Sequence, residues 1–384
     1  MLLGGNMDFE KLSQSIKKHR RYLHTIPELG FEEFKTSTYI KETLKELGYN
    51  PISILNTGVL VYIEGKEKEC YGFRADIDAL PIQEETGVSF VSTHEGKMHA
   101  CGHDGHTSIL LGFAEGLKDI KPKKSILLIF QPAEESPGGA KFIVDEGILS
   151  KYKVQAVFGL HLFPSLAEGI IGTKPGPFMA QTGEIDITIK GKSGHGAMPH
   201  TTIDTVLITA KLLEAYQSII SRNISPIDSA VLTFGKIEGG TARNIIAETV
   251  RIEGTCRTFS KELFNNIVGR MQSIHRGFEE AFGVEITEDI RPMYPPVINT
   301  PSLYEKFRNA TADFPYEELE PVMLAEDFSY YQEAVSGLFF FLGVRNESLG
   351  YTNPLHNCGF NFVEEVLVQG VKVYEKLLKE FDIV

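Results

Sequence analysis

Three short strand-like segments, each followed within four residues by acidic or histidine side chains, constrain the fold of this chain more than any other feature. They cover residues 70–74, 125–130 and 154–160. Short runs rich in buried apolar residues are typical of strands in a parallel sheet. Segments with helical periodicity, residues 107–117 and 139–149, lie between them. We therefore predict an α/β fold with a largely parallel sheet.

Chemically active side chains follow all three segments. They are Asp76 and Asp78, Glu134 and Glu135, and His161. In open α/β sheets, ligands bind outside the carboxyl ends of the strands. The predicted fold therefore gathers these five side chains at one edge of the sheet.

The loop Met98–His106 carries one cysteine and three histidines just ahead of a predicted helix. The potential metal ligands are His99, Cys101, His103 and His106. Thiolate and imidazole together suit a borderline-soft divalent metal. The spacing is not that of a zinc finger, and a histidine-rich loop by itself is often only a solvated turn. The nearby strand-end carboxylates favour a metal centre.

Glu134 and Glu135 are adjacent, and neighbouring side chains of an extended chain point in different directions. One can bind metal while the other takes a proton from water and later delivers it to a leaving amine. The alternative for an isolated Glu-Glu pair is a solvated turn. His161 and His356, each considered alone, are more often hydrogen-bonded core histidines than ligands.

Composition narrows the range of partners. The formal net charge of −13 and the pI near 5.4 argue against binding to nucleic acid or anionic membranes, and they favour a small-molecule substrate. No apolar stretch approaches the roughly 20 residues that span a bilayer. The four cysteines are widely scattered, and residues 1–7 lack a basic region followed by an apolar core. We therefore expect a cytoplasmic protein.

The pattern changes after about Thr182. The predicted elements there are strands at 184–190, 229–236 and 244–257 and helices at 203–219 and 261–281. Alternating strands with helices on one face suggest a small, ferredoxin-like α+β domain. We predict a catalytic metal-binding domain from residues 1–181 and 293–384, with a lid and dimerisation domain of residues 182–292 inserted into it.

Three polar residues of the inserted segment are candidates for substrate contact. His195 is flanked by glycines, so it can approach a ligand closely, although a plain loop residue is equally consistent with the sequence. Asn244 and Arg257 bracket a predicted strand. Arginine can bind a carboxylate through two hydrogen bonds, and a surface ion pair is the alternative.

Seven motifs occur in order along the chain: Gly72–Leu80, His99–His106, Gln131–Glu135, Gly159–His161, Gly194–His200, Ala242–Ala247 and Leu324–Phe328. Together they resemble the aminoacylase–carboxypeptidase metallohydrolases. They are most similar to the amidohydrolase subgroup with hippurate hydrolase, auxin-conjugate hydrolase and N-acetyldiaminopimelate deacetylase. The resemblance extends from about His19 to the C-terminus and is specific for the family rather than for the substrate.

The resemblance implies two divalent metal ions per subunit, zinc or manganese first, with cobalt or nickel as alternatives. The implied ligands are Cys101, His103, Glu135, His161 and His356. His103 occupies the position that bridges the two ions, and Glu134 is the implied general acid and base. Asp78 is implied to orient a metal ligand without binding the ion itself. Many relatives have histidine at the position of Asp76, so Asp76 is not expected to be a ligand.

The resemblance also implies that His195, Asn244 and Arg257 polarise the scissile carbonyl or hold the substrate carboxylate, and that the lid domain forms a homodimer. The leading hypothesis is a metal-dependent amidohydrolase acting on N-acyl-L-amino acids. The alternatives are a dipeptidase or carboxypeptidase, or an N-acetyldiaminopimelate deacetylase of lysine biosynthesis. A metal-binding protein without catalysis is less favoured, because a structural metal site has no need of an adjacent base such as Glu134.

Overall fold

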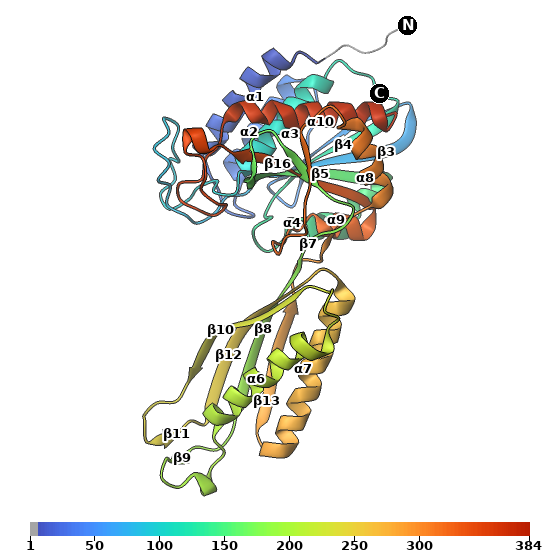
Figure 1. The fold of residues 1–384 in the computed structure, drawn as a ribbon. Coiled ribbons are helices and arrows are strands. Elements are labelled where there is room, and N and C mark those ends of the chain that lie inside the picture. The colour runs from blue at the N-terminus through green and yellow to red at the C-terminus, as the bar shows by residue number, and fades with distance from the viewer. Residues whose placement is uncertain (1–6) are drawn as a thin grey trace. The chain divides into compact units, whose positions relative to one another are not determined.

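The computed structural model describes residues 7–384 and divides the chain into two compact units (Figure 1). Unit 1 contains the chain up to Gly176 together with Ile298–Glu320 and Asp327–Val384, and unit 2 contains Pro177–Val297 and Pro321–Glu326. Residues 1–6, which contributed to the expectation that no signal segment is present, lie outside the described residues. Among the described residues, no helix is both long and apolar enough to cross a membrane.

Unit 1 is built on an eight-stranded sheet of order β1-β2-β4-β3-β5-β16-β6-β15. Its strands are β1 (Ile52–Ile54), β2 (Gly58–Ile63), β3 (Glu67–Asp76), β4 (Lys124–Gln131), β5 (Val154–Ala167), β6 (Ile171–Thr173), β15 (Tyr316–Glu318) and β16 (Ser336–Arg345). The four central strands β4, β3, β5 and β16 run parallel, while β2 and β6 pair antiparallel with their inner neighbours. The predicted α/β fold with a largely parallel sheet is confirmed.

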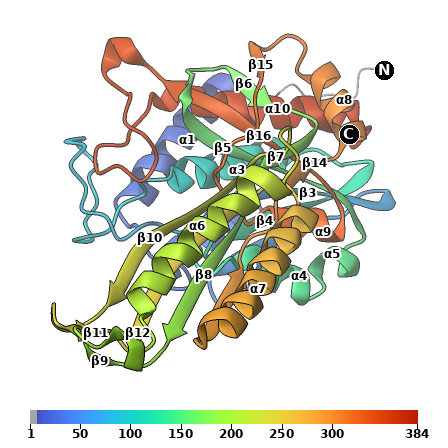
Figure 2. The same cartoon turned by 60° about the horizontal axis from the view of Figure 1, so that its bottom comes forward.

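Successive side chains of the buried strands point to opposite faces of this sheet. On β4, Ile126 and Leu128 join the main hydrophobic core, whereas Leu127 and Ile129 are buried outside it. The main core lies under α1 (Phe9–His24), α2 (Phe34–Glu46), α3 (His103–Leu117), α8 (Pro301–Ala310) and α10 (Leu367–Glu380). The other face carries α4 (Gly139–Asp145) and α9 (Ser329–Ala334) (Figure 1), with α5 (Ile148–Lys151) beside α4 (Figure 2). Two short 3₁₀ helices, η2 (Glu347–Leu349) and η3 (Glu364–Val366), precede α10.

Three predicted elements of unit 1 differ from the structure. The helix expected at 107–117 begins at His103, so His103 and His106 lie in its first turn and not in the loop ahead of it. The helix expected at 139–149 is broken into α4 and α5 at Gly147, whose φ of 70° suits glycine. The strand expected to end just before His161 continues to Ala167, so the prediction that His161 follows a strand end is wrong. The pairing of β3 with β5 ends at Gly159 of β5, but β16 goes on pairing with β5 as far as Ala167. β5 therefore continues beyond His161.

Unit 2 contains a four-stranded antiparallel sheet of order β10-β12-β8-β13 (Figure 1), and its two helices lie side by side over one face of the sheet (Figure 2). Its elements are β8 (Gln181–Lys190), α6 (Thr205–Asn223), β10 (Ala230–Gly239), β12 (Thr249–Thr258), α7 (Lys261–Phe282) and β13 (Glu285–Pro292). This strand-helix-strand-strand-helix-strand sequence is a ferredoxin-like arrangement. The edge strand β13 was not predicted, because its largely exposed side chains leave no clear alternation to read.

Alternation on β8 builds the core of unit 2. Ile185, Ile187 and Ile189 are fully buried and pack with side chains of α6 and α7, such as Leu212 and Phe264. Two small sheets complete the fold: β9 (Gly194–His195) with β11 (Ile245–Ile246), and β7 (Gly176–Met179) with β14 (Val297–Asn299). The chain passes between the two units through β7 and β14.

Candidate metal centre

Two loops and one helix start meet at the carboxyl edge of the parallel strands. α3 begins at His103, directly after Gly102, whose φ of 87° is a left-handed conformation that glycine adopts without strain. Upstream of this turn, Met98 and Leu80 exchange two backbone hydrogen bonds of 3.0 Å each. The loop of Cys101 is thereby fastened to the segment that follows β3 and carries Asp78.

The structure brings the ligand atoms of six predicted site residues into three overlapping groups. Within each group, one ligand atom from each residue lies within 4.8 Å of the others. The groups are Cys101, His103 and His161; Cys101, Glu135 and His356; and His103, Glu134 and Glu135. The overlap through Cys101 and His103 is the arrangement expected of neighbouring metal positions that share ligands.

His103 is oriented by Asp78. Its Nδ1 lies 3.0 Å from the backbone oxygen and 3.2 Å from Oδ1 of Asp78, so Nδ1–H donates there. Its Nε2 is buried and has no hydrogen-bond partner among the described residues. A buried nitrogen without a partner costs about 1–3 kcal/mol, and a metal ion would satisfy its lone pair. This nitrogen and the thiol, imidazole and carboxylate donors around it fit a divalent cation.

The pKa values describe a site with strongly negative surroundings. Burial lowers the pKa of His103, but carboxylates, with Asp76 first, outweigh it and raise the pKa to about 10. Burial raises the pKa of the Cys101 thiol well above its usual range, and Glu135 and Glu134 raise it further. A cation bound here would reverse both effects: it would displace the extra proton of His103, leaving Nε2 free to bind the ion, and it would favour the thiolate of Cys101.

His161 is held by its own backbone. Its Nδ1 donates to the Leu162 oxygen at 2.7 Å, while its Nε2 lies 3.3 Å from Sγ of Cys101. Burial, followed by repulsion from His106, keeps the pKa of His161 well below its usual range. The imidazole is therefore neutral, as metal coordination requires.

His106 was a possible ligand in the sequence, but both of its nitrogens are used in protein hydrogen bonds. Nδ1 donates to Asp76 at 2.6 Å, and Nε2 accepts the N–H of Leu162 at 2.9 Å. His106 therefore holds β5 beside α3. His99 is also buried, belongs to none of the ligand groups, and forms no hydrogen bond through its ring with the described residues.

Glu134 and Glu135 lie in a turn and not in the extended backbone expected from the sequence. The turn begins at Ala133, whose φ of 55° lies in the left-handed region. The Glu135 N–H donates to Oδ2 of Asp78 at 3.0 Å. The Glu134 carboxylate is almost fully buried and accepts from the Asp327 N–H at 3.4 Å. The turn thus gives the two carboxylates different neighbours.

His356 reaches the site from the loop between β16 and α10. Its Nε2 lies 3.1 Å from Oε1 of Glu135, and its N–H donates to the Ala100 oxygen at 2.9 Å. Like Ala133, His356 has a left-handed backbone, with φ 61°. Its side chain is 52% exposed, the most accessible of the predicted ligands for which the structure gives a side-chain value.

Sequence reasoning missed a buried charge network beneath the site. The Arg74 guanidinium donates to Asp76 at 2.7 Å and to Asp327 at 2.8 Å. Gln131 lies between Arg74 and Asp327 and hydrogen-bonds to both. One guanidinium therefore supports Asp76, which orients His106, and Asp327, whose N–H meets Glu134. Arg74 and Asp327 both lie inside motifs that the sequence showed, which was the available signal.

Sequence reasoning also missed Glu33, at the start of α2. Its Oε1 accepts the N–H of Ala133 at 2.8 Å, and its Oε2 accepts the Thr57 hydroxyl at 2.7 Å. Gly30 lies against the same turn, since a Cβ there would come within 2.9 Å of Ala133 Cβ. The α1–α2 connection therefore braces the turn that carries Glu134. A buried acid close to a helix start left no distinguishing pattern in the sequence.

The three predicted substrate residues lie at two ends of unit 2. His195 on β9 is exposed and accepts the Ala197 N–H through Nδ1 at 3.1 Å, and the adjacent strand β11 follows Asn244 directly. The strand expected at 244–257 is divided into β11 and β12, and Arg257 lies next to the last residue of β12, where it pairs with Thr182. The opposite end of this pairing, Thr249 with Lys190, is eight residues away, or about 27 Å. β9 and β11 lie beyond that end (Figure 1).

A model of the peptidase family M20/M25/M40 matches residues 72–380. The chain belongs to this family. N-acetyldiaminopimelate deacetylase of Shouchella clausii is 43% identical over 330 residues, covering 85% of this chain and 88% of that protein. The resemblance read from the seven motifs is thus confirmed.

Two solved structures share the whole fold. The YXEP protein of Bacillus subtilis, described as a dinuclear metal-binding M20 peptidase, is 32% identical with a TM-score of 0.85 and covers 96% of this chain and 98% of its own. A protein of methicillin-resistant Staphylococcus aureus named as an aminohydrolase is 33% identical with a TM-score of 0.92, covering 97% of each chain. This M20 family chain is a metal-dependent amidohydrolase.

The Glu33 brace predicts a pH-dependent stability. Burial raises the pKa of the Glu33 carboxyl from 4.5 to about 7, so the folded protein holds this proton more tightly than the unfolded chain. Stability from this group is therefore greatest below pH 4.5 and falls as the pH rises to 7. Between pH 4.5 and pH 8, we expect the free energy of unfolding of the wild-type protein to fall by about 3 kcal/mol relative to that of Glu33→Gln.

Urea unfolding of both proteins at the two pH values measures this difference. Glu32→Gln, at the exposed neighbouring position, is the control and should follow wild type. Parallel pH profiles for wild type and Glu33→Gln would contradict the raised pKa.

Proposed function

We propose that this chain hydrolyses the amide bond of N-acyl-L-amino acids, with a small-molecule substrate. The observation that carries the proposal is the overlap of three ligand groups around Cys101 and His103, with Glu134 beside them. The named relative at 43% identity favours an N-acetyldiaminopimelate deacetylase as the more specific candidate. Dipeptidase or carboxypeptidase activity is the alternative with the same machinery. A hydrolysis panel of acylated amino acids and dipeptides on metal-loaded protein tests these candidates.

The proposed centre holds two divalent metal ions. Their proposed ligands are Cys101, His103, Glu135, His161 and His356. The thiolate favours zinc, while the histidine and carboxylate donors also suit manganese, cobalt or nickel. When bound, the ions would polarise the amide carbonyl and acidify the attacking water.

Proton transfer and the orientation of the ligands are assigned to side chains of the protein. Glu134 takes the proton of the attacking water on its carboxylate and returns it to the nitrogen of the departing amine. Asp78 holds His103 through Nδ1 and the Glu135 backbone through its other oxygen, which keeps both ligands aimed at the centre.

Residues 182–292 are proposed as a lid and dimerisation domain, inserted between catalytic segments 1–181 and 293–384. Arg257 is proposed to hold the substrate carboxylate, and His195 and Asn244 to contact the attacked carbonyl. Arg257 lies at one end of the unit 2 sheet, and His195 and Asn244 lie beyond the opposite end. The residues of one copy of unit 2 therefore cannot all contact one small substrate. A homodimer in which His195 and Asn244 serve the partner's site resolves this difficulty.

We also propose a cytoplasmic location. All four cysteines are free, and the proposed mechanism needs Cys101 as a thiolate, which a reducing compartment preserves.

Metal should protect Cys101 from alkylation, because a coordinated thiolate has its charge committed to the ion. We expect iodoacetamide labelling of Cys101 to rise about tenfold or more after chelation, measured by peptide mass spectrometry. Cys256, buried in unit 2, should stay unlabelled in both states, and Cys358, which is partly exposed, should react in both. Equal labelling of Cys101 with and without metal would exclude it as a ligand.

Substitutions of the two glutamates should have different effects. Glu134→Gln removes proton transfer but leaves the proposed ligands, so metal content should stay near wild type while kcat falls about 10²–10⁴-fold. Glu135→Gln should lower the metal content itself. Elemental analysis and turnover of both variants, with exposed Glu146→Gln as control, check this assignment. Full metal in Glu135→Gln together with metal loss in Glu134→Gln would reverse the two roles.

Donation of His195 between subunits predicts complementation. His195→Ala and Glu134→Gln homodimers should each be nearly inactive. After subunit exchange in equal amounts, half of the dimers are hybrids with one intact site, so about one quarter of wild-type activity should return. A chain with both substitutions, mixed with either single variant, should restore none. Proven exchange without regained activity would show that His195 does not act across the dimer.

A further inference from the structure

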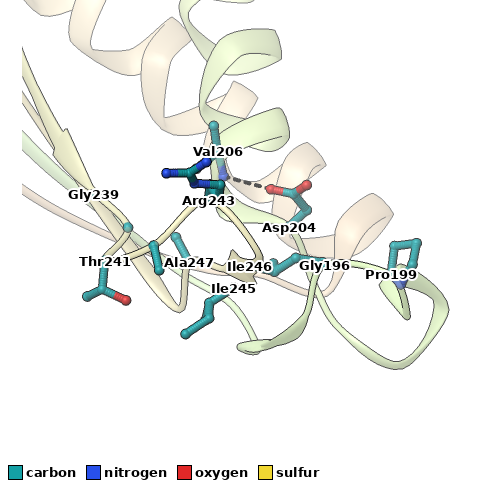
Figure 3. Close-up of a pocket in the computed structure, with 12 residues that line it drawn as sticks. Gly196, Pro199, Asp204, Val206, Gly239, Thr241, Arg243, Ile245, Ile246 and Ala247 are labelled. Atoms are coloured by element: carbon teal, nitrogen blue, oxygen red, sulfur yellow. Dashed lines mark hydrogen bonds between the residues drawn. The ribbon is translucent and has the colours of Figure 1, made fainter.

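A pocket of about 590 Å³ lies in unit 2 beside the loops of His195 and Asn244 (Figure 3). Three segments form its wall: the loop at Gly196 and Pro199, the start of α6 at Asp204 and Val206, and the turn from Gly239 to Ala247. Gly196 and Ile245 are the immediate neighbours of His195 and Asn244 in the chain. A hydrogen bond of 2.9 Å from the Gly196 N–H to the Asn244 oxygen joins the two loops. The chain neighbours of both proposed substrate residues therefore line the pocket, and His195 and Asn244 lie beside it.

Two opposite charges line this pocket. Among residues 7–384, no side chain forms an ion pair or hydrogen bond with the Arg243 guanidinium. Asp204 uses Oδ1 to cap α6, accepting from Val206 and Leu207 at 3.1 and 3.2 Å, and no described cation pairs with it. A guanidinium binds a carboxylate through two hydrogen bonds, and a carboxylate binds an ammonium group. The two side chains together match a zwitterion better than a simple anion.

The rest of the wall suits an aliphatic chain. Val206 is 54% exposed and Ile245 is 47% exposed, although both are branched apolar residues that usually lie inside. Gly240, with φ 78°, turns the loop that carries Arg243 without a side chain to fill the pocket. Methylene groups of a bound ligand would cover the exposed apolar surface of Val206 and Ile245.

We propose that this pocket is a specificity subsite for a zwitterionic amino-acid group, with its carboxylate on Arg243 and its ammonium on Asp204. The inference rests on the proposed function, in which His195 and Asn244 contact the reacting amide. A substrate with its amide at these residues extends its side chain into the adjoining pocket. The substrate class is an N-acylated amino acid whose side chain ends in a second amino-acid group, as in an acylated diaminodicarboxylic acid.

Four substrates separate the two charges: N-acetyl-L,L-diaminopimelate, N-acetyl-2-aminopimelate without the far ammonium, Nα-acetyl-lysine without the far carboxylate, and N-acetylnorleucine with neither. Arg243→Gln should lower kcat/KM about 10- to 100-fold for the two substrates with the far carboxylate and leave the other two within about twofold. Asp204→Asn should lower kcat/KM only for the two substrates with the far ammonium. Asparagine caps helices as well as aspartate does, so α6 is preserved in this variant.

The outcomes distinguish this subsite from the proposed function. Equal losses on all four substrates, or a changed oligomeric state of Arg243→Gln in sedimentation, would overturn the subsite and make the pocket a contact between copies. Wild-type hydrolysis of N-acetylnorleucine without preference for the diaminodicarboxylate would also overturn it, while leaving the amidohydrolase proposal intact. Failure of the metal-loaded protein to hydrolyse any acylated amino acid would overturn both.

Discussion

The carboxylate of Asp78 is the interaction on which the arrangement of the site depends. One oxygen lies 3.2 Å from Nδ1 of His103, and the other accepts the backbone N–H of Glu135 at 3.0 Å. These partners, one at the start of α3 and the other in the turn after β4, are more than 30 residues apart in the chain. A single side chain therefore sets the His103 tautomer and the position of the glutamate turn together. Removing a side chain that holds a metal ligand by a hydrogen bond typically lowers the metal affinity 10- to 100-fold.

A concentration of buried negative charge surrounds this point. Asp76, Asp78 and Asp104 are nearly inaccessible, and arginines offset part of the charge: Arg74 pairs with Asp76, and Arg20 pairs with Asp104. Burying acids costs free energy unless hydrogen bonds and cations compensate. A divalent ion bound here would offset the remaining cost of these buried carboxylates. The raised pKa of His103 is the sign of the same negative potential.

Much of the site could be predicted because its residues follow a rule of sheet geometry. Asp76, Asp78, Glu134 and Glu135 come at the carboxyl ends of parallel strands, which meet at one edge whatever their distance in sequence. His161 departs from this rule because it lies inside β5, which pairing with β16 extends beyond it. Arg74, Asp327 and Glu33 were not identified, because a side chain that acts by holding another residue carries no local signature of that partner.

The sequence by itself determined the class of fold, the ferredoxin-like pattern of the second segment and the set of thiol, imidazole and carboxylate donors, because each depends on periodicity or residue chemistry within a short stretch. Tertiary structure alone decided which donors meet. It left Nε2 of His103 without a protein partner, occupied both nitrogens of His106, and turned the chain at Ala133 so that Glu134 and Glu135 have different neighbours. It also put Arg243 and Asp204 on one pocket. These outcomes depend on contacts between distant segments, which no local pattern encodes.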